Sequence, residues 1–131
     1  MWKAIIVDDN KNNRELVLEI LRGHALCDIA CDGKEAKERY DKSIGAKKPY
    51  DFMILDINMP EVDGLEVLSY IRGKEKKSGI RSGEGLAIIM ATAFEEPFAD
   101  AFDSGCDDYI LKPIDGQRLL EKIRVKLAVQ K

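Results

Sequence analysis

Short apolar runs bounded by polar or turn residues recur five times along the chain. Runs of this kind, too short for buried helices, predict strands that are covered on both faces, as in a parallel sheet. The five runs are Ala4–Val7, Ile29–Ala30 with its flanking cysteines, Phe52–Leu55, Leu86–Ala91 and Tyr109–Leu111.

Helical periodicity fills the segments between the first three runs. The first helix should end at Gly23, and its apolar residues recur at helical spacing: Leu16, Val17, Ile20 and Leu21. Asp32 followed three residues later by Glu35 forms a capping box, which predicts the start of a second helix carrying Ala36 and Tyr40. Both predicted helices are amphipathic, so each should cover one face of a sheet.

The second half of the chain repeats this alternation. Asp63 with Glu66 is another capping box ahead of an apolar stripe, Pro97 begins a helix that Gly105 ends, and Asp115 caps the last helix. The two stripes are Leu65, Leu68 and Ile71, and Leu119 or Leu120 with Ile123 and Leu127. Five strand–helix repeats without a break predict one doubly wound, three-layer α/β domain spanning residues 1–131.

Polar residues follow four of the predicted strands at the point where each ends. Asp8 and Asp9 follow the first strand, Asp56 the third, Thr92 the fourth and Lys112 the fifth. Because parallel strands end at one edge of the sheet, these groups should converge there. Three neighbouring carboxylates repel one another unless a cation joins them, and oxygen ligands suit Mg²⁺. The pattern therefore predicts a magnesium site that is suited to phosphoryl transfer.

Composition limits the function classes. The 131 residues are 45% hydrophobic and 34% charged with a net charge of -3, typical of a globular domain without general affinity for nucleic acid or anionic membranes. The longest apolar run, Leu86–Phe94, is too short to cross a bilayer, and the N-terminus lacks signal-peptide features, so we expect a cytoplasmic protein. His24 is interpreted as structural or solvated, and the three cysteines as buried, reduced thiols.

Four motifs resemble the response-regulator receiver domain of two-component signalling, and the likeness covers essentially the whole chain. They are Val-Asp-Asp at 7–9, Leu-Asp-Ile-Asn-Met-Pro-Glu-Val-Asp-Gly at 55–64, Ala-Thr-Ala at 91–93 and Gly-Cys-Asp-Asp-Tyr-Ile-Leu-Lys-Pro-Ile at 105–114. The resemblance implies a CheY-like, flavodoxin-like fold with five parallel strands in the order 2-1-3-4-5. It also implies a signalling domain that catalyses only its own phosphorylation and dephosphorylation.

The resemblance assigns a role to each residue at the predicted edge. Asp56 would accept a phosphoryl group from a phosphohistidine on a sensor histidine kinase or a histidine phosphotransfer protein. Asp9 and Asp56 would bind Mg²⁺ directly, the backbone carbonyl of Asn58 would supply another ligand, and Asp8 would act through a bound water. Lys112, followed by a proline bond that is often cis in the family, would pair with the phosphoryl oxygens.

Thr92 and Tyr109 resemble the family's switch pair. When Asp56 is phosphorylated, the Thr92 hydroxyl would move to donate to a phosphoryl oxygen, and Tyr109 would turn inward into the vacated space. This would remodel an output surface that binds a separate target protein, because no output domain is expected within the chain. We expect a monomer that could pair through this surface when phosphorylated, on the basis of an acidic fourth helix and a basic fifth helix.

Two departures from the family pattern lead to further expectations. Phe94 is apolar where many receivers place a carboxylate or amide that positions the hydrolytic water, so the phosphoryl group should be long-lived. The stretch from Arg72 to Gly85 is basic and longer than usual, and it is interpreted as a solvated loop. Together with Lys47 and Lys48 it should lie opposite the phosphorylation edge, where partner docking is the alternative interpretation.

Other functions remain open from the residues alone. A phosphatase of the haloacid dehalogenase type needs a second acid two residues after its nucleophile, where this chain has Asn58. A flavodoxin-type binding module needs a phosphate loop where this chain has Asp8 and Asp9. An inert scaffold with the same shape is a third alternative. Within the receiver family, a phosphorelay intermediate or a phosphate sink is the alternative to an output regulator.

Overall fold

Five strands form one parallel sheet, which four described helices cover. The computed structural model describes residues 1–57, 59, 63–93 and 105–129. Its elements, in chain order, are β1 (Trp2–Val7), α1 (Lys11–Leu21), β2 (Ala25–Ala30), α2 (Gly33–Gly45), β3 (Phe52–Asp56), α3 (Gly64–Lys77), β4 (Ala87–Thr92), β5 (Asp108–Leu111) and α5 (Gly116–Val129). The helix predicted from Pro97, together with Asn58 and Phe94, lies outside the described residues.

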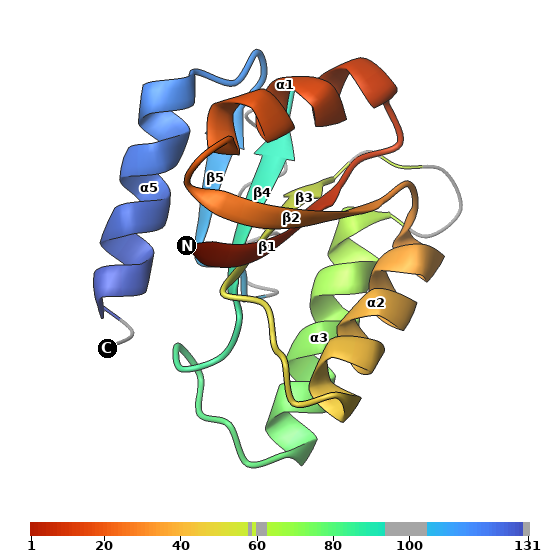
Figure 1. Cartoon of the computed structure of the whole chain (residues 1–131). Helices are drawn as coiled ribbons and strands as arrows, with labels where there is room; N and C mark the ends of the chain where they lie inside the picture. Colours follow the sequence, from red (N-terminus) through yellow and green to blue (C-terminus); the bar gives the residue numbers. More distant parts are fainter. Residues whose placement is uncertain (58, 60–62, 94–104, 130–131) are drawn as a thin grey trace.

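The strand order β2-β1-β3-β4-β5 confirms the predicted doubly wound topology. All four strand pairings are parallel, and α1, α2 and α3 each connect two consecutive strands from β1 to β4 (Figure 1). Val7 pairs with both Ala30 and Leu55, and Asp56 pairs with Ala91. The strands therefore end nearly level, and their C-terminal ends form a single edge, called the carboxyl edge below.

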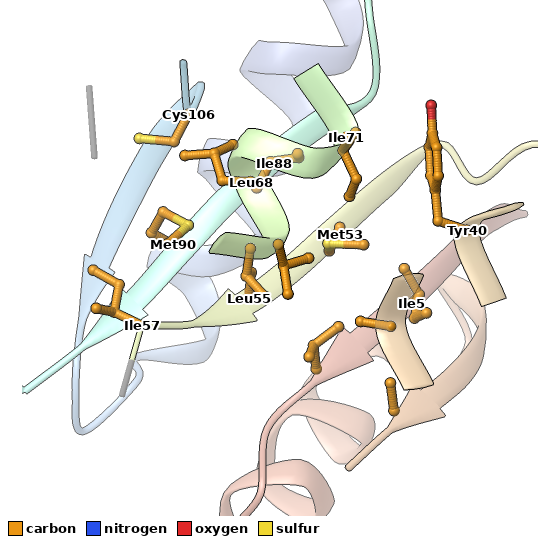
Figure 2. Close-up of a cluster of buried hydrophobic side chains, with 14 of the residues drawn as sticks. Ile5, Tyr40, Met53, Leu55, Ile57, Leu68, Ile71, Ile88, Met90 and Cys106 are labelled. Atoms are coloured by element: carbon orange, nitrogen blue, oxygen red, sulfur yellow. The ribbon is translucent and has the colours of Figure 1, made fainter. Parts of the chain in front are cut away.

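The sheet face under α2 and α3 carries one of two apolar clusters (Figure 2). Alternate residues of the strands point to this face and pack against the inner sides of the two helices. The labelled side chains in the figure are Ile5, Tyr40, Met53, Leu55, Ile57, Leu68, Ile71, Ile88, Met90 and Cys106. Because Leu68 and Ile71 are fully buried here, the predicted stripe of α3 is confirmed for these two residues.

The intervening strand residues form the second cluster, which α1 and α5 cover. Ile6, Phe52 and Ile89 lie on this face, opposite the residues of the first cluster. The helices contribute Val17 and Leu21 from α1, and Leu119 and Ile123 from α5. Two buried apolar clusters on opposite faces hold the central strands rigidly, so the residues at their ends have well-defined positions.

The helix starts are made by the side chains that the sequence indicates. Asp32 accepts a hydrogen bond from the backbone N–H of Glu35 (2.8 Å), Asp63 from that of Glu66 (2.9 Å), and Asp115 from that of Arg118 (3.1 Å). Asn10 caps α1 in the same way, by accepting from the N–H of Asn13 at 3.0 Å. Each cap satisfies a backbone donor that has no partner within the helix.

Three sequence expectations are wrong in detail. β2 and β5 are not buried on both faces, because they are the two edges of the sheet, whereas Ala4–Val7 of β1 and all of β3 and β4 are buried as expected. Cys31 is exposed and follows β2, so the expectation of buried thiols fails at this residue. The basic stretch from residue 72 is not all loop, since α3 continues to Lys77.

None of the helices within the described ranges is long and apolar enough to cross a membrane. The assignment of residues 1–131 to a single domain without an output domain stays a prediction.

Candidate functional site

Four strands deliver the predicted site residues to the carboxyl edge of the sheet. Asp8 and Asp9 directly follow β1, Asp56 is the last residue of β3, and Thr92 is the last residue of β4. Lys112 follows β5, and its backbone N–H donates to the carbonyl of Thr92 at 2.8 Å. The level ends of the parallel strands therefore bring together residues that lie far apart in the sequence.

Three carboxylates form an acidic cluster at this edge. Oxygens of Asp8, Asp9 and Asp56 all lie within 4.8 Å of one another. Asp8 and Asp56 are only 5% and 3% exposed, whereas Asp9 is exposed. Two of the acids are thus largely removed from water, and the third borders the solvent from which a cation would enter.

Lys112 supplies positive charge to the two buried acids. Its Nζ lies 3.2 Å from Oδ1 of Asp56 and 3.4 Å from Oδ2 of Asp8. The lysine side chain is 21% exposed, so this pairing is only partly screened by water. The peptide bond between Lys112 and Pro113 is cis. One ammonium group between two carboxylates leaves a net negative charge, which a divalent cation would offset.

Two hydrogen bonds from nearby residues hold Asp8 in place. The second carboxylate oxygen of Asp8, Oδ1, accepts from the N–H of Asn10 at 2.9 Å, and the guanidinium of Arg14 donates to the Asp8 carbonyl at 2.8 Å. Sequence reasoning missed Arg14, although its place one turn into the helix after the acids is a signal that could have found it. These contacts orient Asp8 without using its oxygen that faces Lys112.

Gly64 lies directly against the backbone of the candidate phosphoacceptor. Its N–H donates to the carbonyl of Ile57 at 3.0 Å. A Cβ atom at this position would lie 2.8 Å from Cα of Ile57 and 3.0 Å from the carbonyl carbon of Asp56, and closer still to the Asp56 carbonyl oxygen. The first residue of α3 must therefore lack a side chain to approach the end of β3 this closely.

The two predicted switch residues differ in burial. Thr92 is fully buried at the end of β4, next to the strand that carries Asp56. Tyr109 is partly buried and packs against the apolar cluster under α2 and α3. Lys122 of α5 lies over its ring, 5.5 Å from the centroid, and also lies 3.2 Å from a carboxylate oxygen of Asp108. Tyr109 thus lies where β5 meets α5.

This arrangement has the ingredients of a metal site with a nucleophilic carboxylate. Oxygen donors this close need only small rotations to share one cation, either directly or through water, and an all-oxygen ligand set suits Mg²⁺. Asp8, Asp9 and Asp56 therefore fit the predicted ion. Asn58, the fourth predicted ligand, lies outside the described residues.

Comparison with known proteins defines the class of this domain. The model of the response regulator receiver domain matches residues 4–124, and the chain belongs to this family. It is 37% identical to the response regulator ArlR of Staphylococcus epidermidis, over 99% of the chain and 54% of ArlR. It is 34% identical to the chemotaxis protein CheY of Listeria monocytogenes, over 94% of the chain and 96% of that protein.

A solved structure supports the same assignment. The response regulator TrrA of Thermotoga maritima, determined in complex with Mg²⁺-BeF, superposes with a TM-score of 0.79 at 33% identity, over 96% of this chain and 99% of TrrA. The chain spans about half the length of ArlR but nearly all of CheY. The resemblance inferred from the four sequence motifs is therefore confirmed, as is the predicted fold.

Membership of this family gives the general class of the domain. Receiver domains are signalling domains of two-component systems and not metabolic enzymes, and they typically bind Mg²⁺ at an acidic pocket. They interact with histidine kinases or phosphotransfer proteins. This assignment disfavours the phosphatase and flavodoxin-type alternatives considered from the sequence.

Proposed function

We propose that this receiver domain accepts a phosphoryl group on Asp56 in a Mg²⁺-dependent reaction and signals by a change of its output surface. The observation that carries the proposal is the cluster of Asp8, Asp9 and Asp56 with the Lys112 ammonium 3.2 Å from Asp56. A nearly buried carboxylate beside a cation and two further acids is suited to act as a phosphoryl acceptor.

The three acids of the cluster supply oxygen donors, the kind of ligand that Mg²⁺ prefers. Asp9 and Asp56 would bind it directly, the backbone carbonyl of Asn58 would add a ligand, and Asp8 would act through water. The bound ion would neutralise negative charge on the transferring group and its acceptor. TrrA, to which this chain is 33% identical, was solved in complex with Mg²⁺-BeF, which supports the same assignment here.

The transfer step needs little from the protein beyond positioning and charge. A carboxylate oxygen of Asp56 attacks phosphorus of a phosphohistidine, a P–O bond forms, and the P–N bond breaks. The imidazole nitrogen keeps the electron pair of the broken bond and takes a proton from the solvent, which leaves a neutral histidine. Lys112 moves from pairing with the Asp56 carboxylate to pairing with the phosphoryl oxygens, so the charge of the product remains compensated.

The phosphoryl group then changes the surface through Thr92 and Tyr109. The Thr92 hydroxyl donates to a phosphoryl oxygen, and Tyr109 moves toward the space that this vacates. Tyr109 is only partly buried and packs beside α5, so its movement would change the surface that β5 and α5 form. Light scattering with and without a phosphoryl mimic tests whether a second copy of the domain binds this surface.

Intact-mass measurement with acetyl phosphate tests the chemistry. The wild type, an isosteric Asp56→Asn variant and a control Asp51→Asn variant are incubated with and without Mg²⁺. Asp51 lies at the opposite edge of the sheet, where it accepts a hydrogen bond from the N–H of Lys3 at 2.8 Å. We expect one phosphoryl adduct on the wild type and the control, dependent on Mg²⁺, and none on Asp56→Asn.

Adduct formation by Asp56→Asn at the wild-type rate, or without Mg²⁺, contradicts the proposal. If the wild type forms no adduct and releases no phosphate, the inert-scaffold alternative holds. The predicted long phosphoryl lifetime is tested in the same assay, where a Phe94→Glu variant should lose its adduct faster than the wild type.

A further inference from the structure

The edge of the sheet opposite the phosphorylation site contains a hollow that the proposed function does not use. It has a volume of about 430 Å³ and is lined by the end of α3, the connection between α3 and β4, and the segment before β5. This connection lies at the bottom of Figure 1, away from the β4 arrowhead. The residues that matter among its lining are Arg72, Glu75, Lys76, Ile80, Arg81 and Asp107. We call this the basic hollow.

The inner part of the basic hollow is a built network centred on Arg72. Its guanidinium donates to the carbonyl of Gly105 at 2.8 Å, to Glu75 at 2.7 Å and to Asp107 at 2.9 Å. Glu75 is only 6% exposed. All three guanidinium nitrogens therefore have partners, and Arg72 ties α3 to the segment before β5.

The two acids of this network are also satisfied. The second oxygen of Glu75 accepts from the N–H of Leu86 at 2.6 Å. Asp107 accepts from the N–H of Ile88 at 2.7 Å and has Lys126 at 3.7 Å. Two carboxylates and two cations cancel one another, so the inner network adds little net charge to the hollow.

The rim of the hollow carries the unbalanced charge. Lys76 and Arg81 are both exposed, and within the described parts of the chain neither side chain forms an ion pair. The nearest acid of the same connection, Glu84, lines a neighbouring hollow instead. Two positive side chains above a neutral, rigid floor produce a locally positive surface on a chain whose net charge is -3.

The neighbouring hollow has a different character and shares Ile80 with the first. It has a volume of about 450 Å³, and most of its lining is aromatic or aliphatic, including Trp2, Tyr40, Ile44 and Tyr50. Ile80 is 40% exposed and Ile44 is 48% exposed. The basic hollow thus adjoins a mainly apolar one, and the two share Glu75, Ile80 and Gly85 in their linings.

We infer that these adjoining hollows dock a short acidic segment of a partner protein, with carboxylates at Lys76 and Arg81 and a neighbouring apolar side chain in the hollow lined by Trp2 and Tyr50. Charge complementarity with Lys76 and Arg81 identifies the acidic part, and the apolar lining of the neighbouring hollow, in which Ile44 and Ile80 are exposed, identifies its anchor. The spacious basic hollow, with charge from long side chains rather than backbone N–H groups, fits a peptide better than a single phosphate ion.

Tryptophan fluorescence and amide chemical shifts provide the test. Trp2 is the only tryptophan of the chain and lines the apolar hollow, so its emission reports on occupancy. The probe is the blocked peptide acetyl-Glu-Asp-Glu-Gly-Phe-amide, and a peptide with three lysines in place of the acids serves as its control. Inorganic tripolyphosphate is the third ligand, because it carries the charge without the apolar side chain.

Charge reversal separates this site from general electrostatics. The variant Lys76→Glu/Arg81→Glu is compared with Lys34→Glu/Arg124→Glu, which changes the net charge equally at exposed positions on α2 and α5. We expect the acidic peptide to bind the wild type and the control alike, and the first variant about tenfold or more weakly. Affinity should fall several-fold when NaCl is raised from about 50 mM to about 300 mM.

The inference is overturned if the acidic peptide shows no saturable binding, if the lysine peptide binds equally well, or if the Lys76→Glu/Arg81→Glu variant binds the acidic peptide with unchanged affinity. Tripolyphosphate binding as tightly as the peptide, with the same amide shifts, also overturns it, because the site would then be a simple anion site. Phosphorylation of Asp56 by acetyl phosphate should be unchanged in both charge-reversal variants. Failure of docking is therefore distinguishable from failure of the proposed function.

Discussion

Adding a single methyl group at Gly64 should disturb both folding and the phosphoacceptor. A Cβ atom there would lie 2.8 Å from Cα of Ile57 and 3.0 Å from the carbonyl carbon of Asp56. Ordinary van der Waals contact begins at 3.4 Å, so the backbone after β3 must retreat by about 0.6 Å or more. No flexible side chain can absorb this displacement, because the obstructing atoms belong to the backbone.

The magnitude follows from two opposing terms. Overpacking a tight site costs about 1–3 kcal/mol, and this contact with backbone lies toward the upper end of that range. Replacing a helical glycine by alanine returns about 0.5–1 kcal/mol. Gly64→Ala should therefore lower the free energy of unfolding by about 2 kcal/mol, which corresponds to about 7 °C in Tm for a chain of this size.

The same helix provides a matched control at Gly73. A Cβ atom at Gly73 would meet nothing within 4 Å. Gly73→Ala should therefore show the helix-propensity gain alone and raise the free energy of unfolding by about 0.5–1 kcal/mol. The two alanine variants should differ in stability by about 3 kcal/mol although they make the same chemical change in one helix.

Urea denaturation and acetyl phosphate labelling measure the two consequences of Gly64→Ala. Because Asp56 carries the acceptor carboxylate, a shift of its backbone should slow phosphorylation about tenfold or more, whereas Gly73→Ala should label at the wild-type rate. The reasoning is refuted if Gly64→Ala is as stable as Gly73→Ala and is phosphorylated equally fast. Loss of stability without loss of labelling would refute the link between this glycine and the acceptor.

Three further predictions concern other parts of the molecule. Lys112→Met leaves the nearly buried Asp8 and Asp56 without their shared cation. Thermal denaturation at pH 7 should therefore show a free energy of unfolding that is lower by about 1–2 kcal/mol and that Mg²⁺ largely restores. A variant as stable as the wild type without Mg²⁺ would contradict this prediction. Burial and then the hydrogen bond to Asp28 raise the pKa of Tyr50 above the ordinary value of 10.0, so the unfolded chain loses this proton first and stability should fall as pH rises above about 10. Tyr50→Phe should flatten that decline in urea titrations, and an unchanged slope would count against it. Burial raises the pKa of the Cys106 thiol to about 11, so alkylation followed by mass spectrometry should modify the exposed Cys31 first and Cys106 last.

Much of the fold and site could be predicted because the information is local. Capping residues such as Asp32, Asp63 and Asp115 mark helix starts through hydrogen bonds to residues three positions away, and all three predictions are confirmed. Alternating strands and helices indicate a parallel sheet, whose strand ends must share one edge. Asp56 and Lys112 could therefore be placed together from the chain alone, although the strand order came from family resemblance.

The tertiary structure alone decided which of these residues touch and how far they are from water. Lys112 meets Asp8 across 104 positions of sequence, and Arg72 meets Asp107 across 35, so neither contact has a local signal. The sequence also did not show which strands lie at the edges of the sheet. Cys31 is exposed because it follows β2, which has a neighbouring strand on one side only. Local periodicity determines the elements, while packing of distant segments determines distances, charge balance and exposure. The basic hollow at the opposite edge of the sheet follows from that packing, because its floor is built from contacts between α3 and the segment before β5.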